Sequence, residues 1–194
     1  AQLAELIFAH AKLPAQIVRG GAGNSFCTRH VVPSSARPVL ALAFQRLQTA
    51  GDVGDLGVLF AQHCLEAVRP AFAASVQPGD VLVAGPNFGI GSSREQAAGA
   101  LRHLGLAAVI SPSYSGLFFR NAFNLGLLLL TCPEGDAIEE GEGITLNEQT
   151  PSVTTAHGRV LACDPIPPFL LDMVRAGGLM NQLRARFGKE PLHG

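Results

Sequence analysis

The chain has 194 residues, of which 47% are hydrophobic and 15% charged, and this is enough for one domain with a sizeable core. That balance argues against disorder, and the net charge of −1 argues against a nucleic-acid partner held by charge. No apolar run approaches the roughly 18 residues of a membrane span. No signal-peptide pattern opens the sequence, so we expect a cytoplasmic protein with no membrane partner.

The first third of the chain predicts only short elements. Residues 2–12 have helical spacing and stop before Pro14. Residues 16–19 and 25–32 are predicted as short extended segments on either side of a glycine-rich stretch. Helices are predicted over residues 37–48 and 59–68, and residues 69–80 are expected to form a connection that ends in a turn.

Residues 81–132 alternate between strand and helix patterns. Strands are predicted over 81–84, 107–111 and 127–132, with helices over 95–104 and 115–125. Two successive strand–helix–strand steps imply parallel strands with right-handed crossovers. Gly105 and Gly126 follow the two helices, where a left-handed residue is favoured.

In the last part of the chain, the spacing of apolar residues changes from the strand–helix pattern to short alternating runs. Residues 144–163 contain short alternating runs, which predict hairpin strands with turns near 150–151 and 157–158. Helices are predicted over 169–176 and 179–186, on either side of a Gly-Gly break. The three glutamates at 139, 140 and 142 are interpreted as a solvated turn.

The most informative stretch is residues 85–95, Gly-Pro-Asn-Phe-Gly-Ile-Gly-Ser-Ser-Arg-Glu, between the first predicted core strand and its helix. Glycine tolerates positive φ and lets the backbone approach a ligand closely. The helix that follows offers unpaired N–H groups to an anion. Arg94 adds a planar fork for a carboxylate or phosphate, and Ser92 and Ser93 add two hydroxyls. This pattern indicates a site for a small anionic substrate.

Two common motifs do not fit this stretch. A P-loop needs Gly-Lys-[Ser/Thr], and a dinucleotide fingerprint needs a third glycine where Arg94 stands. A simpler interpretation stays open, in which Ser92 and Glu95 form a capping box and carry no chemistry.

Residues 87–95 resemble the signature of the aconitase superfamily's swivel domain. The likeness continues through Arg-His-Leu-Gly at 102–105, Ser-Tyr at 113–114, Phe-Phe-Arg-Asn at 118–121 and Asn-Leu-Gly-Leu at 124–127. By pattern, the chain is similar to the family of 3-isopropylmalate dehydratase and homoaconitase small subunits. The resemblance implies an α/β fold of the swivelling β/β/α type, a single domain over 1–194. Residues 68–186 would be the family-like core and residues 1–67 an atypical N-terminal part.

The resemblance also implies a chemistry, that of a hydro-lyase or isomerase acting on a hydroxy di- or tricarboxylate, as in leucine biosynthesis. In this family a serine alkoxide removes a proton next to a carboxylate, and a [4Fe–4S] cluster binds the departing hydroxyl. Motif match makes Ser92 the catalytic base, with Ser93, Arg94 and Asn87 binding substrate. A serine is a weak base, and helix N–H groups and Arg94 suit the stabilisation of its anion.

The cluster is expected on a partner, because the four cysteines cannot hold it. Cys27, Cys64, Cys132 and Cys163 are scattered, with a spacing that fits neither zinc nor an iron–sulfur cluster. Free thiols are favoured over two disulfides. We therefore expect no metal on this chain and a large, cluster-bearing subunit as its partner.

The N-terminal part departs from the family pattern. Residues 27–33 read Cys-Thr-Arg-His-Val-Val-Pro, with Arg29 and His30 where related chains carry a carboxylate. His30 is therefore a candidate substrate-loop residue, and the resemblance adds Arg37 as another, because family enzymes use a second arginine from this part of the domain. The departure also supports a rival interpretation, a non-catalytic or regulatory paralogue that binds a small carboxylate or a partner protein. The intact Ser92-Ser93-Arg94 opposes it.

Overall fold

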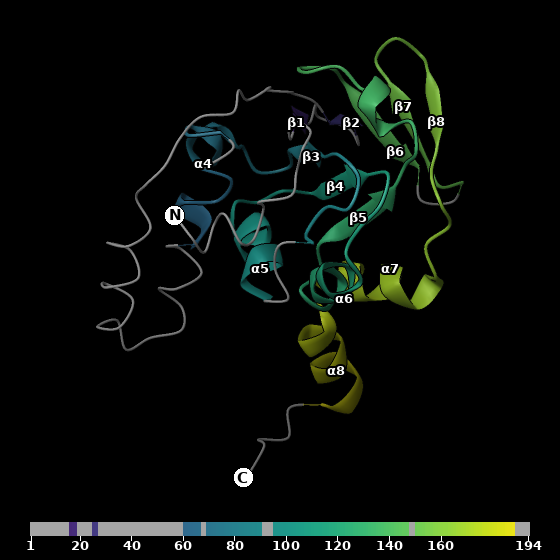
Figure 1. Ribbon diagram of the computed structural model, residues 1–194. Helices are drawn as coiled ribbons and strands as arrows, with labels where there is room; N and C mark the ends of the chain where they lie inside the picture. The colour runs from purple at the N-terminus through teal and green to yellow at the C-terminus, as the bar shows by residue number, and fades with distance from the viewer. Residues whose placement is uncertain are drawn as a thin grey trace.

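The computed structural model describes residues 16–18, 25–26, 60–66, 69–90, 95–147 and 150–188; for the two segments before residue 60 it describes the backbone alone. Two four-stranded sheets and a set of helices make up these parts (Figure 1). Within them, no helix has the length and apolar character needed to cross a membrane.

The first sheet has the strand order β1-β3-β4-β5. Its strands are β1 (Gln16–Val18), β3 (Val81–Val83), β4 (Ala108–Ser111) and β5 (Leu128–Thr131). β3, β4 and β5 run parallel, with Val81 opposite Ala108 and Ala108 opposite Leu128, and β1 is antiparallel to β3. β3 and β4 are buried at every position, as expected for a parallel sheet covered on both faces. The mainly parallel central sheet is therefore confirmed.

Two helices form the crossovers of this sheet. α5 (Glu95–His103) joins β3 to β4 and α6 (Gly116–Asn124) joins β4 to β5, and the two helices contact each other (Figure 1). α5 buries three alanines and Leu101, while α6 buries Phe118 and Phe123. The buried side chains of α5 are mostly small and those of α6 larger, and both sets belong to the core that the sheets share.

The glycines predicted to end these helices have left-handed backbones, with φ of 83° at Gly105 and 77° at Gly126. At Gly126 a Cβ would lie 2.6 Å from the carbonyl carbon of Gly177. The end of α6 therefore approaches the break between the two last helices, α7 (Pro168–Arg175) and α8 (Leu179–Phe187). Both terminal helices were predicted, and both are confirmed.

The second sheet has the order β2-β6-β7-β8 and is antiparallel throughout. It contains β2 (Ser25–Phe26), β6 (Ile144–Asn147), β7 (Ser152–Thr155) and β8 (Val160–Ala162). The predicted hairpin strands are confirmed. Ile144, Val153 and Leu161 point into the same hydrophobic core as the first sheet, so the two sheets and the crossover helices share one core.

Three features of the described residues differ from the sequence-based expectations. A short helix, α4 (Phe72–Ser75), lies where only a connection was expected, and a 3₁₀ turn, η1 (Gly135–Ala137), follows β5. The predicted helix over 59–68 is helical at residues 60–62 and turns at 63–66, with Leu65 at φ 53°. The predicted elements at residues 2–12 and 37–48 lie outside the described residues.

The interpretation of the glutamates as a solvated turn is wrong for Glu142. Glu142 is 8% exposed, and its carboxylate accepts hydrogen bonds from the N–H groups of Glu139 at 2.9 Å and His157 at 3.4 Å. Burial opposes ionisation, but these bonds and one from the Thr155 side chain together lower the Glu142 pKa below its ordinary 4.5. Glu140 lies 3.6 Å from Arg69, whose pKa is lowered by burial. The segment is therefore held by buried carboxylate contacts.

Candidate functional site

The signature loop begins where β3 ends, at the carboxyl edge of the parallel strands. The N–H of Ala84 donates to the carbonyl of Ile110 at 2.8 Å, which is the last ladder bond before the chain leaves the sheet. The chain then turns at Asn87, with φ of 59°, and at Gly89, with φ of 82°. Asparagine and glycine are the residues that most readily adopt this left-handed conformation. Ligands of open α/β sheets bind at this edge of the parallel strands.

Backbone hydrogen bonds fix this loop to the loop that follows β4. The N–H of Phe88 donates to the carbonyl of Ser113 at 3.0 Å, and the N–H of Ser115 donates to the carbonyl of Phe88 at 2.9 Å. The N–H of Asn87 donates to the Ser113 hydroxyl oxygen at 2.8 Å. Phe88 and Tyr114 thereby form a parallel bridge beyond the end of the sheet. The two loops act as one unit.

Ser111, the last residue of β4, connects the two loops through its side-chain hydroxyl. It is fully buried, and its hydroxyl oxygen lies 2.8 Å from the carbonyl of Gly85 and 2.8 Å from that of Ser113. The hydroxyl has one proton and shares it between two acceptors. Sequence reasoning missed this residue. The available signal was a hydroxyl at the end of a buried apolar strand, which needs a partner when it is buried.

Aromatic side chains support the loop. The rings of Phe88 and Phe118 meet edge to face with centroids 5.1 Å apart. Gly89 lies directly on the Phe118 ring: a Cβ there would overlap Cβ and Cγ of Phe118 and lie 2.8 Å from Cδ2. The close approach that Gly89 permits is therefore to an aromatic ring of α6 and not to a ligand.

Tyr114 anchors the second loop in the sheet. Its hydroxyl lies 2.8 Å from the carbonyl of Val109 and 2.9 Å from that of Leu130, so it bridges β4 and β5. Burial raises the Tyr114 pKa well above its ordinary value. The phenol therefore stays protonated at neutral pH and acts as a hydrogen-bond donor, not as a base.

The signature loop leads into α5, and three of the predicted site residues lie in the sequence just before this helix. Ile90 is 56% exposed, and Glu95, the first residue of α5 in the described part of the chain, is also exposed. Residues 91–94, which include Ser92, Ser93 and Arg94, lie outside the described residues. His30 and Arg37, in the N-terminal part of the chain, also lie outside them. The capping-box interpretation, which needs Ser92, falls outside them too. Asn87 is the one predicted site residue in the described ranges; it is exposed, with its side-chain oxygen 3.5 Å from the Ser113 hydroxyl.

Comparison with known proteins places this loop in a family. The model of the aconitase C-terminal domain matches residues 62–135, which contain β3 to β5 and both crossover helices. A 3-isopropylmalate dehydratase small subunit from Methanopyrus kandleri is 38% identical over 173 residues, covering 87% of this chain and 93% of that relative. The chain belongs to the 3-isopropylmalate dehydratase small-subunit family, in the aconitase superfamily.

Other relatives agree with this assignment. A small subunit of the same dehydratase from Aliarcobacter butzleri is 42% identical over 130 residues, covering 66% of this chain and 78% of the relative. The crystal structure of 3-isopropylmalate dehydratase from Methanocaldococcus jannaschii superposes with a TM-score of 0.63 at 34% identity, covering 67% of this chain and 78% of that one. The expected family and fold class are confirmed. The 173-residue alignment is longer than residues 68–186 allow, so it also includes part of residues 1–67.

The described residues do not fit an iron–sulfur cluster. They include Cys64, Cys132 and Cys163, all free, and no group of three or more metal-ligating side chains occurs among them. A [4Fe–4S] cluster needs several thiolates around one point. The described part of this chain therefore offers no site for such a cluster.

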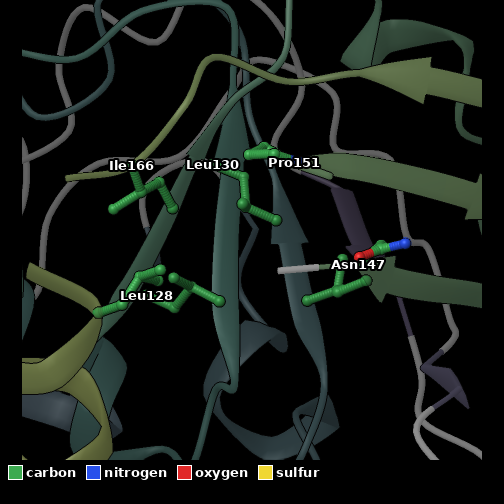
Figure 2. Close-up of a pocket in the computed structure, with 7 residues that line it drawn as sticks. Leu128, Leu130, Asn147, Pro151 and Ile166 are labelled. Carbon is green, nitrogen blue, oxygen red and sulfur yellow. The ribbon is translucent and has the colours of Figure 1, made fainter. Parts of the chain in front are cut away.

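A small pocket elsewhere does not suit a carboxylate. It lies between β5, β6 and the segment that leads into α7 (Figure 2), and its lining is almost wholly apolar: Leu128, Leu130, Leu146, Asn147, Pro151, Ile166 and Leu171. Its polar member, Asn147, accepts a hydrogen bond from the Thr150 N–H at 3.1 Å. No cation lines this pocket, so the signature loop remains the candidate site for an anion.

Proposed function

We propose that this chain is the small subunit of a 3-isopropylmalate dehydratase, an enzyme of leucine biosynthesis. The observation that carries the proposal is the likeness to the Methanopyrus kandleri small subunit over 93% of that relative. The described geometry supports it, since the signature loop stands at the carboxyl edge of the parallel strands, where α/β proteins bind small ligands. The substrate class is a hydroxy dicarboxylate.

We further propose that residues 92–94 carry the chemistry of this chain. Ser92 is the base that removes a proton from the carbon next to a carboxylate, while Ser93 and Arg94 hold substrate carboxylates. A serine alkoxide needs nearby positive potential, and Arg94 with the N–H groups at the start of α5 has the right character to supply it. Support comes from the neighbouring backbone: the loop up to residue 90 is anchored by hydrogen bonds to residues 113 and 115, and α5 follows at Glu95.

Asn87 is the proposed substrate contact on the loop itself. Its backbone is fixed in a left-handed turn by the Ser113 hydroxyl, and its exposed amide accepts a long hydrogen bond of 3.5 Å from that hydroxyl, which leaves the amide nitrogen on the exposed side of the loop for a substrate. We propose that His30 and Arg37 contribute to substrate selection, His30 because it stands where related chains carry an acidic pattern, and Arg37 because the family resemblance implies a second arginine from this part of the domain.

A large subunit is proposed as the partner that carries the [4Fe–4S] cluster. The relatives are named small subunits, and the described cysteines of this chain do not form a cluster site. The chain purified alone is therefore expected to show no iron–sulfur absorbance and no turnover.

The proposal is tested by producing the chain together with a dehydratase large subunit and reconstituting the pair without oxygen. Turnover is measured with 3-isopropylmalate and, as comparisons, with malate and citrate, which are a shorter and a tricarboxylic hydroxy acid. Turnover highest with 3-isopropylmalate supports the proposal. A pair that assembles with bound cluster but turns over none of the three acids contradicts it and favours a non-catalytic paralogue.

A further inference from the structure

Two cysteines lie side by side where the two sheets meet. Cys132 follows β5 of the first sheet, and Cys163 follows β8 of the second. The N–H of Asp164 donates to the carbonyl of Thr131 at 2.8 Å, so the residues next to both cysteines are joined by a backbone hydrogen bond. The Cys163 thiol donates to the Leu161 carbonyl at 4.0 Å, and each of the two thiols lies near enough to the other to shift its pKa.

This spacing suits a disulfide. Chain segments joined by backbone hydrogen bonds lie about 4.7–4.9 Å apart. A disulfide joins Cα atoms that are about 4.4–6.8 Å apart, with side chains directed toward each other. The backbone bond between the neighbouring residues brings the two segments together, and thiols that shift each other's pKa lie on facing sides, so the disulfide can form with little movement of the backbone.

We propose that Cys132 and Cys163 are a reversible redox pair that a peroxide oxidises to a disulfide. One thiolate attacks hydrogen peroxide, which gives a sulfenic acid and one water after protonation. The second thiol then attacks that sulfur, forms the S–S bond and releases a second water. Two thiols thus lose two protons and two electrons, and one peroxide becomes two waters. A dithiol reductant reverses the change by thiol–disulfide exchange.

Their surroundings distinguish this pair from Cys64. Cys163 is half-buried, which lets a small oxidant reach the pair, while Cys132 is fully buried. The neighbouring Cys163 thiol lowers the Cys132 pKa, and the neighbouring Cys132 thiol together with burial raises the Cys163 pKa. Cys64 is fully buried, and burial raises its pKa far above the ordinary value. Cys64 is therefore expected to stay unreactive.

The pair is connected to the signature loop. The N–H of Cys132 donates to the carbonyl of Ser111 at 3.0 Å, and the Ser111 hydroxyl contacts the Gly85 carbonyl. Oxidation would therefore link the two sheets covalently, one hydrogen bond away from the loops that bear the candidate site.

The test uses a full-length Cys27→Ser/Cys64→Ser variant, in which the two cysteines of the pair are the only ones left. It is treated with hydrogen peroxide, its remaining thiols are alkylated after denaturation, and its peptides are mapped by mass spectrometry. We expect one intramolecular link between the peptides of Cys132 and Cys163, loss of the mass of two hydrogen atoms, and full recovery with dithiothreitol. The melting temperature of the oxidised form should rise by about 5–10 °C, because the link closes a loop of the unfolded chain.

The same treatment of the wild-type chain gives a check that depends on no variant. There the Cys132–Cys163 link should again form while Cys64 is still alkylated after denaturation. In a matched control, Cys163→Ser should give no link and no peroxide-dependent rise in melting temperature. Sulfinic acid on Cys163 with Cys132 unmodified, or a link that involves Cys27 or Cys64 instead, would overturn the proposal.

Discussion

Replacement of Gly89 by alanine should lower the free energy of unfolding more than the same replacement at a glycine that has positive φ but open space around it. Two costs combine at this position. The φ of 82° costs a residue with a Cβ about 1–2 kcal/mol. The new methyl group would also overlap the Phe118 ring, and forcing an extra carbon into a packed site costs about 1–3 kcal/mol. Alanine also restricts the unfolded chain, which offsets about 0.4–1 kcal/mol.

The net loss for Gly89→Ala is therefore about 1–4.5 kcal/mol of unfolding free energy, or a drop of about 2–18 °C in melting temperature for a chain of this size. Urea unfolding and thermal melting followed by circular dichroism both measure it.

Gly158→Ala is the matched control, because Gly158 has a φ of 77° but nothing within 4 Å of the added Cβ. It should lose only about 1 kcal/mol. If Gly89→Ala and Gly158→Ala melt at the same temperature, the close packing of the loop on Phe118 is refuted.

Three further changes test other parts of the structure. Tyr114→Phe removes the hydroxyl that bridges the Val109 and Leu130 carbonyls, and should cost about 1–2 kcal/mol in urea unfolding; an unchanged midpoint would argue against that bridge. Glu142→Gln should cost about 1–3 kcal/mol at pH 7. Because the folded-state pKa of Glu142 is lowered, this difference from wild type should persist above pH 4.5 and shrink as the pH falls through the folded-state pKa, whereas a difference independent of pH would contradict the buried carboxylate. Arg94→Lys keeps the charge but loses the two-pronged fork, so kcat/KM of the assembled enzyme should fall by about 10- to 100-fold with little change in melting temperature; unchanged kcat/KM would mean that Arg94 does not touch substrate.

The order of strands and helices from residue 81 onward followed from local patterns. Apolar runs such as Val81–Val83 and glycines such as Gly105 act over a few neighbours, and the helix and strand ends fell within one or two residues of prediction. The short helix α4 was missed because four residues carry too little periodicity to predict it.

The hydrogen bonds that hold the candidate site could not be predicted from the sequence in the same way. Ser111 and Gly85 are 26 residues apart and meet only because β3 and β4 are neighbours. Glu142 resembles a solvated residue in sequence, because its partners at 155 and 157 come from the other strand of a hairpin. Long-range hydrogen bonds of this kind leave no local pattern. The loop's position was predictable, and the roles of residues 92–94 remain predictions that kinetics must decide.

The measurement that tests the central claim most directly is the turnover of Ser92→Ala in the reconstituted two-subunit enzyme with 3-isopropylmalate, beside Ser93→Ala. If Ser92 is the base, kcat for Ser92→Ala should fall by about 10²–10⁴-fold while the substrate still binds, because Arg94 is intact. Ser93→Ala should show a smaller loss, mostly in KM. A near-normal kcat for Ser92→Ala, with only a loss of about 0.5–2 kcal/mol in stability, would instead make Ser92 a helix cap and contradict the proposed role.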